Sequence, residues 1–122
     1  MYELTVEREF SVAHYLREYD GACARLHGHN YRVQITVGGE QLDDAGMLLD
    51  FADLKQLCDA VIDQLDHRCL NEIAPFDEIN PTSENLAQYL YQSVGGGLPD
   101  AVSVQRVTVF ESARSSATYN EE

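Results

Sequence analysis

The 122-residue chain is long enough for one domain with a buried core, since 44% of its residues are hydrophobic. Its formal net charge of -13 argues against binding to nucleic acid or to an anionic membrane surface, and it has no apolar run long enough to span a membrane. Lys55 is the one lysine among eight basic residues, against 21 acidic ones, which favours a halophilic protein from a salty cytoplasm where self-repulsion is screened.

The cysteines and the start of the chain indicate the compartment. Cys23, Cys58 and Cys69 form an odd set with no C-x-x-C pair, which fits a reducing cytoplasm better than a disulfide scaffold. The chain enters a strand pattern at Tyr2 without a basic segment followed by an apolar one, so we expect no signal peptide. Both observations predict a cytoplasmic protein.

Two long strands are predicted in the first third of the chain. Residues 2–14 and 27–37 each alternate between apolar and polar side chains, the pattern of a half-buried strand. We expect them to form an antiparallel pair. The connection over residues 15–26 is long for a hairpin, and loops of that length are often functional.

Three histidines fall on the apolar faces of these two strands. His27 and His29 are two residues apart, so on a strand they point to the same side and can reach one metal ion. His14 ends the preceding strand on its mostly apolar face. Three imidazoles with an open fourth position favour zinc, with iron, nickel or copper as alternatives.

Helices are predicted next along the chain. Apolar residues recur at three- and four-residue steps over residues 50–66, with Asp50 as the N-terminal cap. A second helix begins after Pro81, capped by Thr82 or Ser83, and the glycines at 95–97 end it.

Two further strands are predicted after the helices. Residues 102–111 are rich in valine, and their apolar phase changes from even to odd positions, which indicates a bulge near Gln105 or Arg106. Residues 115–119 form a short fourth strand. The order ββααββ predicts an α+β fold, an antiparallel four-stranded sheet with two helices on one face. Because such a sheet leaves open edges, we expect closure into a barrel by oligomerisation.

A thiol and an acid–histidine pair are candidates for proton transfer. Cys23 lies in the long connection beside the expected metal, and the nearby charge of Arg25 favours its thiolate. Asp66 and His67 directly follow the first helix. They form either a helix end with a favourable imidazole or an acid–base pair in which Asp66 orients His67 toward Cys23.

A carboxylate at the end of the valine-rich strand is a candidate anchor. Glu111 stands where the apolar face would continue, so it is either exposed or a buried anchor. A carboxylate binds paired N–H donors bidentately, and a 2-aminopyrimidinone ring offers such a pair. Thr82 and Ser83 are either helix caps or hydroxyls near this carboxylate.

Taken together, these residues resemble the 6-pyruvoyl-tetrahydropterin synthase / 6-carboxytetrahydropterin synthase family along nearly the whole chain. The segments that carry the resemblance are 10–14 (FSVAH), 23–29 (CARLHGH), 46–51 (GMLLDF), 65–67 (LDH) with Leu70 and Asn71, 81–85 (PTSEN), and Glu111 ahead of Tyr119. Each motif alone is weak, whereas six in this order are specific.

The resemblance implies a fold, a cofactor and a set of roles. It implies a tunnelling fold assembled as a homohexamer of two trimers, and 7,8-dihydroneopterin triphosphate as substrate. The implied roles are zinc ligation by His14, His27 and His29, proton transfer by Cys23 with Asp66 and His67 contributed across a subunit interface, and pterin binding by Glu111 with Thr82 and Ser83. Arg8, Arg17, Arg25 and Arg114 are candidates to hold the triphosphate.

Several reactions fit these residues. The three-residue gap between Cys23 and His27 resembles the 6-carboxytetrahydropterin synthases of the 7-deazaguanine (queuosine and archaeosine) pathway, rather than the longer gap of the animal pyruvoyl enzymes. Formation of 6-pyruvoyl-tetrahydropterin is the alternative within the family. A cysteine hydrolase that uses Cys23, His67 and Asp66, and a non-catalytic zinc-binding module, are alternatives from other classes.

Overall fold

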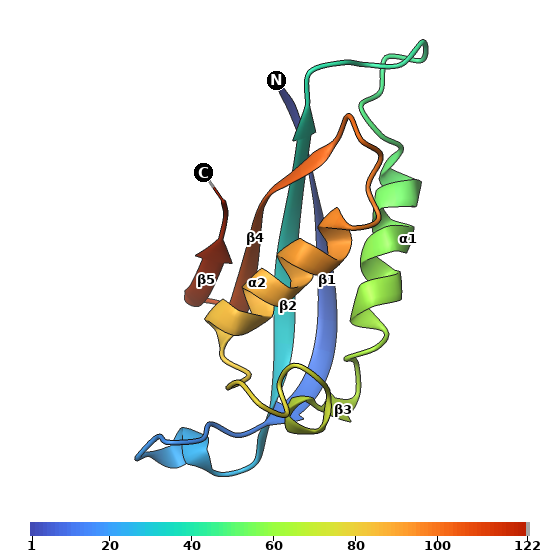
Figure 1. The fold of residues 1–122 in the computed structure, drawn as a ribbon. Helices are drawn as coiled ribbons and strands as arrows, with labels where there is room; N and C mark the ends of the chain where they lie inside the picture. Colours follow the sequence, from blue (N-terminus) through green and yellow to red (C-terminus); the bar gives the residue numbers. More distant parts are fainter. Residues whose placement is uncertain (122) are drawn as a thin grey trace.

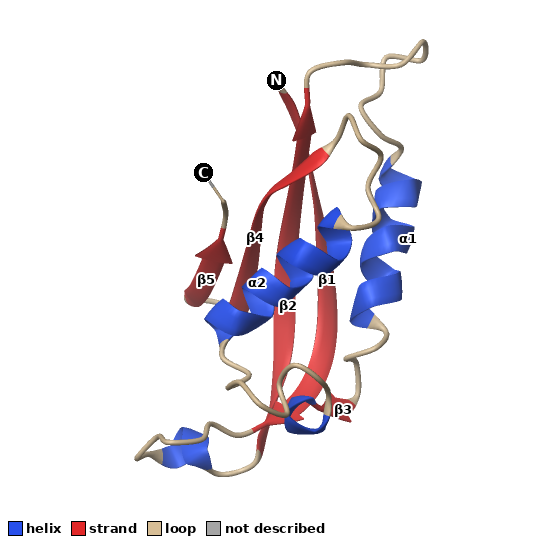
Figure 2. Ribbon diagram, viewed as in Figure 1, coloured by secondary structure: helices blue, strands red, loops and turns tan. Residues whose placement is uncertain are grey.

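A computed structural model describes residues 1–121 of the chain, in which two helices cover one face of a single twisted sheet (Figures 1 and 2). The sheet has five strands in the order β3-β1-β2-β4-β5. The predicted α+β class, with both helices on one face, is confirmed. None of the helices in residues 1–121 is long and apolar enough to cross a membrane.

The first two strands form the long centre of the sheet. β1 (Tyr2–His14) and β2 (His27–Gly39) pair antiparallel along their whole length, from Tyr2 opposite Gly39 to His14 opposite His27. The predicted alternation is confirmed, because Val6, Phe10 and Val12 are buried on the helix side of β1. This register places the histidine-bearing ends of both strands side by side.

The last two strands complete one edge of the sheet. β4 (Ser103–Ser112) pairs with β2, and β5 (Ser115–Tyr119) pairs with β4. The register between β2 and β4 shifts by one residue at Gln105, so the predicted bulge is confirmed. A second shift leaves Glu111 as the extra residue of β4 opposite β5. Bulges bend a strand and redirect a side chain, which bears on the orientation of Glu111.

The two helices pack their apolar stripes onto the sheet. In α1 (Phe51–Ile62) the Asp50 carboxylate accepts a hydrogen bond from the Ala52 amide at 2.8 Å, as a cap should. In α2 (Ser83–Gly95) the cap is Thr82, whose hydroxyl accepts from the Asn85 amide at 3.1 Å. Leu54, Cys58 and Ile62 of α1 and Leu86, Ala87, Leu90 and Val94 of α2 are buried.

The end of the first helix and the strand that follows it differ from the prediction. The helix ends at Ile62 rather than at Asp66, because residues 63–67 turn and His67 takes a left-handed backbone conformation with φ 60°. The turn leads into β3 (Arg68–Cys69), which pairs parallel to Val12 and Ala13 of β1. The sheet therefore has a fifth strand that is too short to leave an alternation pattern in the sequence.

Candidate functional site

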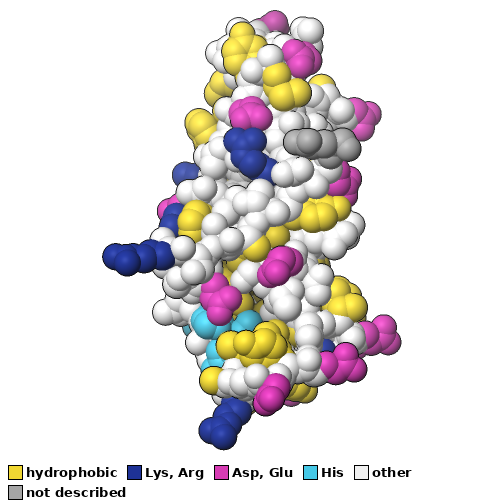
Figure 3. All heavy atoms as spheres, turned by 90° about the vertical axis from the view of Figure 1, so that its left-hand side faces the viewer, with side chains coloured by type: hydrophobic (Ala, Val, Ile, Leu, Met, Phe, Trp, Pro, Cys, Tyr) yellow, Lys and Arg dark blue, Asp and Glu magenta, His cyan; other side chains and the backbone are white. Residues whose placement is uncertain are grey.

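The three histidines of the strand motif converge at one end of the sheet. His14, His27 and His29 each offer a ring nitrogen, and these atoms lie within 4.8 Å of one another. Their ring centroids are 4.6 to 4.9 Å apart. Histidine side chains reach the surface at this end of the molecule (Figure 3). The convergence follows from the register of β1 and β2.

Hydrogen bonds fix which nitrogen two of the rings can offer a metal. The Nδ1 atom of His14 lies 2.9 Å from the Pro81 carbonyl, and that of His27 lies 2.6 Å from the Arg25 carbonyl. A carbonyl only accepts, so each Nδ1 must carry the proton and donate. The lone pairs of these two rings are therefore on Nε2, and a carbonyl that orients the ligand ring is the usual arrangement around a metal-binding histidine.

The third ring contacts a carboxylate. His29 Nε2 lies 3.1 Å from Glu111 Oε1 without the geometry of a hydrogen bond, so this buried nitrogen remains available as a ligand. Burial lowers the pKa of His14 and of His29 below the ordinary histidine value, and the Glu111 carboxylate only partly opposes this at His29. These two imidazoles are thus neutral near pH 7, which is the form that binds a transition metal. Together with His27 they make three imidazole donors, a set that fits zinc.

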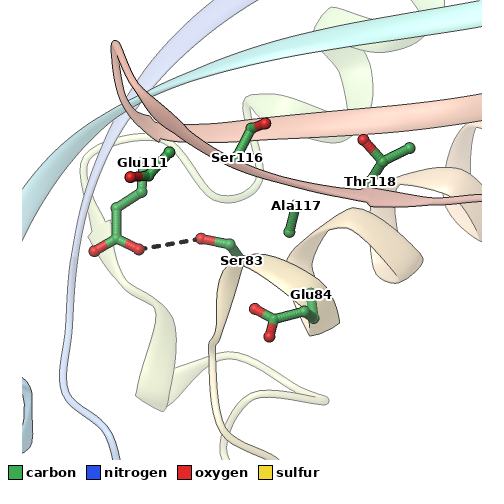
Figure 4. A pocket seen from close by; sticks show the side chains of 7 residues that line it. Ser83, Glu84, Glu111, Ser116, Ala117 and Thr118 are labelled. Atoms are coloured by element: carbon green, nitrogen blue, oxygen red, sulfur yellow. Dashed lines mark hydrogen bonds between the residues drawn. The ribbon is translucent and has the colours of Figure 1, made fainter.

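Glu111 also borders a pocket between α2 and β5. Its Oε2 accepts a hydrogen bond from the Ser83 hydroxyl at 3.2 Å, and the two side chains point toward each other from β4 and from the start of α2 (Figure 4). The pocket has a volume of about 410 Å³ and is lined by Ser83, Glu84, Glu111, Ser115, Ser116, Ala117 and Thr118. A carboxylate held in this way can accept two N–H donors of a planar ring. Thr82 lies just before this helix, and its hydroxyl is used as the cap.

Cys23 lies in the connection between β1 and β2, the two strands that carry the three histidines. It lies in a short 3-10 turn over Ala22–Ala24, where its carbonyl accepts from the Leu16 amide at 2.8 Å. Burial raises the pKa of the Tyr31 phenol, with smaller contributions from the Glu111 carboxylate and from Cys23, and the Tyr31 ring packs against His14 and His29. The thiol is half-buried.

The Asp66–His67 pair directly precedes β3, the edge strand farthest from β5. Asp66 Oδ1 accepts from His67 Nδ1 and from the Ser11 amide, both at 2.9 Å, and the His67 amide donates to the Ser11 carbonyl at 2.6 Å. The Ser11 and His67 hydrogen bonds lower the Asp66 pKa, so Asp66 is a carboxylate that orients the imidazole. The His67 side chain is 81% exposed. Within residues 1–121, no hydrogen bond or ion pair joins this pair to Cys23.

The structure separates the four candidate arginines. Arg8 is paired with Asp59 of α1 at 2.9 Å, and Arg17 donates to the carbonyls of Ile79 and Phe76. Their guanidinium groups therefore stabilise the fold. Arg25, in the loop with Cys23, and Arg114, in the β4–β5 turn, are exposed.

Sequence reasoning missed the side chains that hold the Cys23 loop in place. The Asn71 amide exchanges two hydrogen bonds of 3.0 Å with the backbone of Tyr15, and Asn80 does the same with Arg17 at 2.8 Å. The residue type was the only available signal, since an asparagine amide can match one backbone N–H and one C=O. Nothing in the sequence shows which backbone it will meet.

Comparison with known proteins places these features in a family. The family model described as 6-pyruvoyl tetrahydropterin synthase matches residues 3–122. The 6-carboxy-5,6,7,8-tetrahydropterin synthase of Bacillus subtilis is 42% identical over 98 residues, which cover 76% of this chain and 65% of that protein. The Synechocystis protein of the same name is 34% identical over 125 residues, covering 98% and 93%.

A solved structure is similar over the whole chain. The 6-pyruvoyl tetrahydropterin synthase of Caenorhabditis elegans superposes with a TM-score of 0.82 at 31% sequence identity. The match covers 100% of this chain and 98% of that one. The tunnelling fold expected from the sequence is thereby confirmed.

Proposed function

The chain belongs to the 6-pyruvoyl tetrahydropterin synthase family, and on that premise we propose that it is a zinc-dependent 6-carboxytetrahydropterin synthase. It would convert 7,8-dihydroneopterin triphosphate and one water to 6-carboxy-5,6,7,8-tetrahydropterin, acetaldehyde and triphosphate, a step toward 7-deazaguanine bases. The observation that carries the proposal is the convergence of three imidazoles with the Glu111 carboxylate. The names of the two bacterial relatives and the short spacing from Cys23 to His27 favour the carboxy product.

Zinc is the cofactor we propose for His14, His27 and His29. Bound there, it would supply Lewis acidity to the side-chain hydroxyls of the substrate and so acidify the adjacent C–H bonds. The carbonyls of Pro81 and Arg25 keep two of the ligand rings in the correct tautomer.

Glu111 is the proposed anchor of the pterin ring. Its carboxylate can accept both N–H groups on the aminopyrimidinone edge, and the hydrogen bond from Ser83 holds one of its oxygens. Thr82 would act by fixing the start of α2, from which Ser83 projects. Of the arginines, Arg25 and Arg114 are the ones we propose for the triphosphate, since they are exposed.

Cys23 and the Asp66–His67 pair are the proposed proton-transfer groups. The Cys23 thiolate would remove a proton from the substrate side chain, and Asp66 would hold His67 with its Nδ1 as donor and its Nε2 open to exchange a proton. His67 lies at the β3 edge of the sheet and Glu111 lies near the β5 edge, and no hydrogen bond or ion pair joins them within residues 1–121. We therefore propose that copies join edge to edge, so that His67 serves the neighbouring Cys23 in a homohexamer of two trimers.

Products distinguish this proposal from the pyruvoyl alternative. After anaerobic incubation with dihydroneopterin triphosphate, acetaldehyde trapped in step with triphosphate release is expected, with a carboxy pterin found by mass spectrometry. A pyruvoyl pterin accumulating without acetaldehyde would assign the other reaction. A cysteine hydrolase would need no metal, and a zinc-binding module would bind metal without pterin, so chelation and a pterin titration separate those two.

Mixing two inactive variants tests the shared site. Cys23→Ala and His67→Ala each lack one proton-transfer group, yet a mixed oligomer can contain sites with both. Co-refolded or co-expressed variants should regain activity in mixed assemblies, whereas a simple mixture of the two finished proteins should not. Failure of co-expressed variants to regain activity, with mixed assemblies confirmed by native mass spectrometry, would place the relay within one copy.

A further inference from the structure

The segment that leads into α2 contacts two groups of the proposed site. The Pro81 carbonyl accepts a hydrogen bond from His14 Nδ1 at 2.9 Å, and the Ser83 hydroxyl donates to Glu111 at 3.2 Å. This short segment therefore holds a proposed metal ligand and the proposed ring anchor. Asn80 directly precedes it, and its side chain reaches a third part of the site, the connection between β1 and β2.

The half-buried side chain of Asn80 matches both polar backbone groups of Arg17. Its Oδ1 accepts from the Arg17 amide and its Nδ2 donates to the Arg17 carbonyl, each at 2.8 Å. One asparagine amide can satisfy an N–H and a C=O in this way. Asn80 is itself tied to α2, because the Asn85 side chain donates to its carbonyl at 2.8 Å. Arg17 is thereby anchored to the start of the helix.

This anchor reaches Cys23 through the residue beside Arg17. The Arg17 N–H belongs to the planar peptide group shared with Leu16, so the hydrogen bond to Asn80 also fixes the Cα atom of Leu16. The Leu16 amide in turn donates to the Cys23 carbonyl at 2.8 Å and joins the two arms of the connection. The connection extends beyond the end of the sheet (Figure 1), where a loop is mobile unless it is tied down.

We propose that Asn80 is a positioning residue that acts through Arg17 and Leu16 on the Cys23 thiol. Because the same segment holds Glu111, Asn80 sets the distance between the group that binds the ring and the group that removes a proton from the substrate side chain. Such positioning matters, since a misplacement of about 1 Å can lower a rate about a hundredfold. The inference rests on the proposed function and adds to it a residue that acts through another.

The test compares turnover with binding in Asn80→Ala. In the zinc-loaded oligomer, kcat for dihydroneopterin triphosphate should fall about ten- to hundredfold. The zinc content and the Kd for unsubstituted pterin should be unchanged, because the Pro81 carbonyl and the Ser83 hydroxyl remain. A merely structural role would weaken binding together with turnover. Asn120→Ala is the matched control, since Asn120 is an exposed asparagine beyond β5, and it should change none of the three measurements.

A double-mutant cycle tests the route through Cys23. In a Cys23→Ala background, Asn80→Ala should have no further effect on the single-turnover rate, because the group that it positions is already missing. Asn80→Asp is the second variant if the alanine variant does not fold. It keeps the acceptor for the Arg17 amide and lacks the donor for the Arg17 carbonyl, so it should lower kcat with the same dependence on Cys23.

The outcomes separate this inference from the proposed function. An unchanged kcat in the Asn80 variants, or an equal loss with and without Cys23, would overturn the role of Asn80 and leave the proposed reaction intact. Loss of zinc or of pterin binding in these variants would also overturn it, because Asn80 would then support the whole site. A parental protein that does not convert dihydroneopterin triphosphate would overturn the proposed function and the role of Asn80 with it.

Discussion

Replacing His27 by alanine tests the proposed metal centre with little effect on the stability of the fold. His27 is only partly buried and lies at the first position of β2, away from the hydrophobic core between sheet and helices. Its loss removes one of three ligand nitrogens and leaves His14 and His29 in place. In the absence of metal, the Tm of His27→Ala should therefore equal that of the parental protein.

The effect should appear when zinc is present. Zinc at about 1,000 times its Kd stabilises a protein that binds it by about 4.1 kcal/mol. Changes in groups that merely support a ligand weaken metal binding by up to about 100-fold, and the loss of a ligand should cost at least that much. At the same zinc concentration about 1.4 kcal/mol remains, so about 2.7 kcal/mol is lost. For a chain of this length this corresponds to about 10 °C in Tm.

Calorimetry with a chelator and with buffered zinc measures this difference, and elemental analysis gives the metal content. The parental protein should hold about one zinc per chain and His27→Ala much less. His67→Ala is the matched control, because His67 is the one histidine outside the cluster and its side chain is 81% exposed. It should keep both the zinc and the full Tm increment. Full zinc occupancy in His27→Ala would refute the assignment of the metal site.

Three further predictions concern the thiol, the anchor and the charge. Cys23→Ala should keep its zinc and its Tm while turnover falls about a hundredfold or more. Cys58→Ala, which removes a fully buried thiol from α1, should instead lower the Tm. Near-normal turnover in Cys23→Ala would exclude Cys23 as the base. Glu111→Gln should weaken pterin binding about ten- to hundredfold, measured by titration, because an amide cannot accept two N–H donors as a carboxylate does; an unchanged Kd would exclude the anchor. The Tm should rise as potassium chloride is raised from low to molar concentration, because a net charge of -13 repels itself less when screened; a flat or falling Tm would remove the halophilic interpretation.

The long strands could be predicted because their physical signal is local. Alternation at period two marks β1 and β2, and since His14, His27 and His29 share the apolar phase, their convergence follows once the two strands pair. The bulge at Gln105 was also visible, as a change of phase among the valines. These features depend on neighbours in the sequence, or on one pairing that the pattern itself specifies.

The features that were missed depend on distant partners. The first helix ends at Ile62 because the chain must turn to bring His67 onto the backbone of Ser11, and nothing between residues 50 and 66 encodes that contact. Arg17 is occupied by carbonyls some sixty residues away, so a single sequence could not distinguish it from exposed Arg25.

The extra residue at Gln105 shifts the alternation of side chains along β4 by one position. Before it, Val104 faces the helices opposite Val37; after it, Val107 and Val109 do so opposite Ile35 and Val33. If Gln105 paired with Thr36 in a regular ladder, the residues that follow would change sides, since a one-residue slip in a strand turns every side chain to the other face. Val107 and Val109 would then lie on the open face, and Glu111, six residues beyond the bulge, would turn away from His29. The orientation of the carboxylate is therefore set by a bulge that lies outside the site.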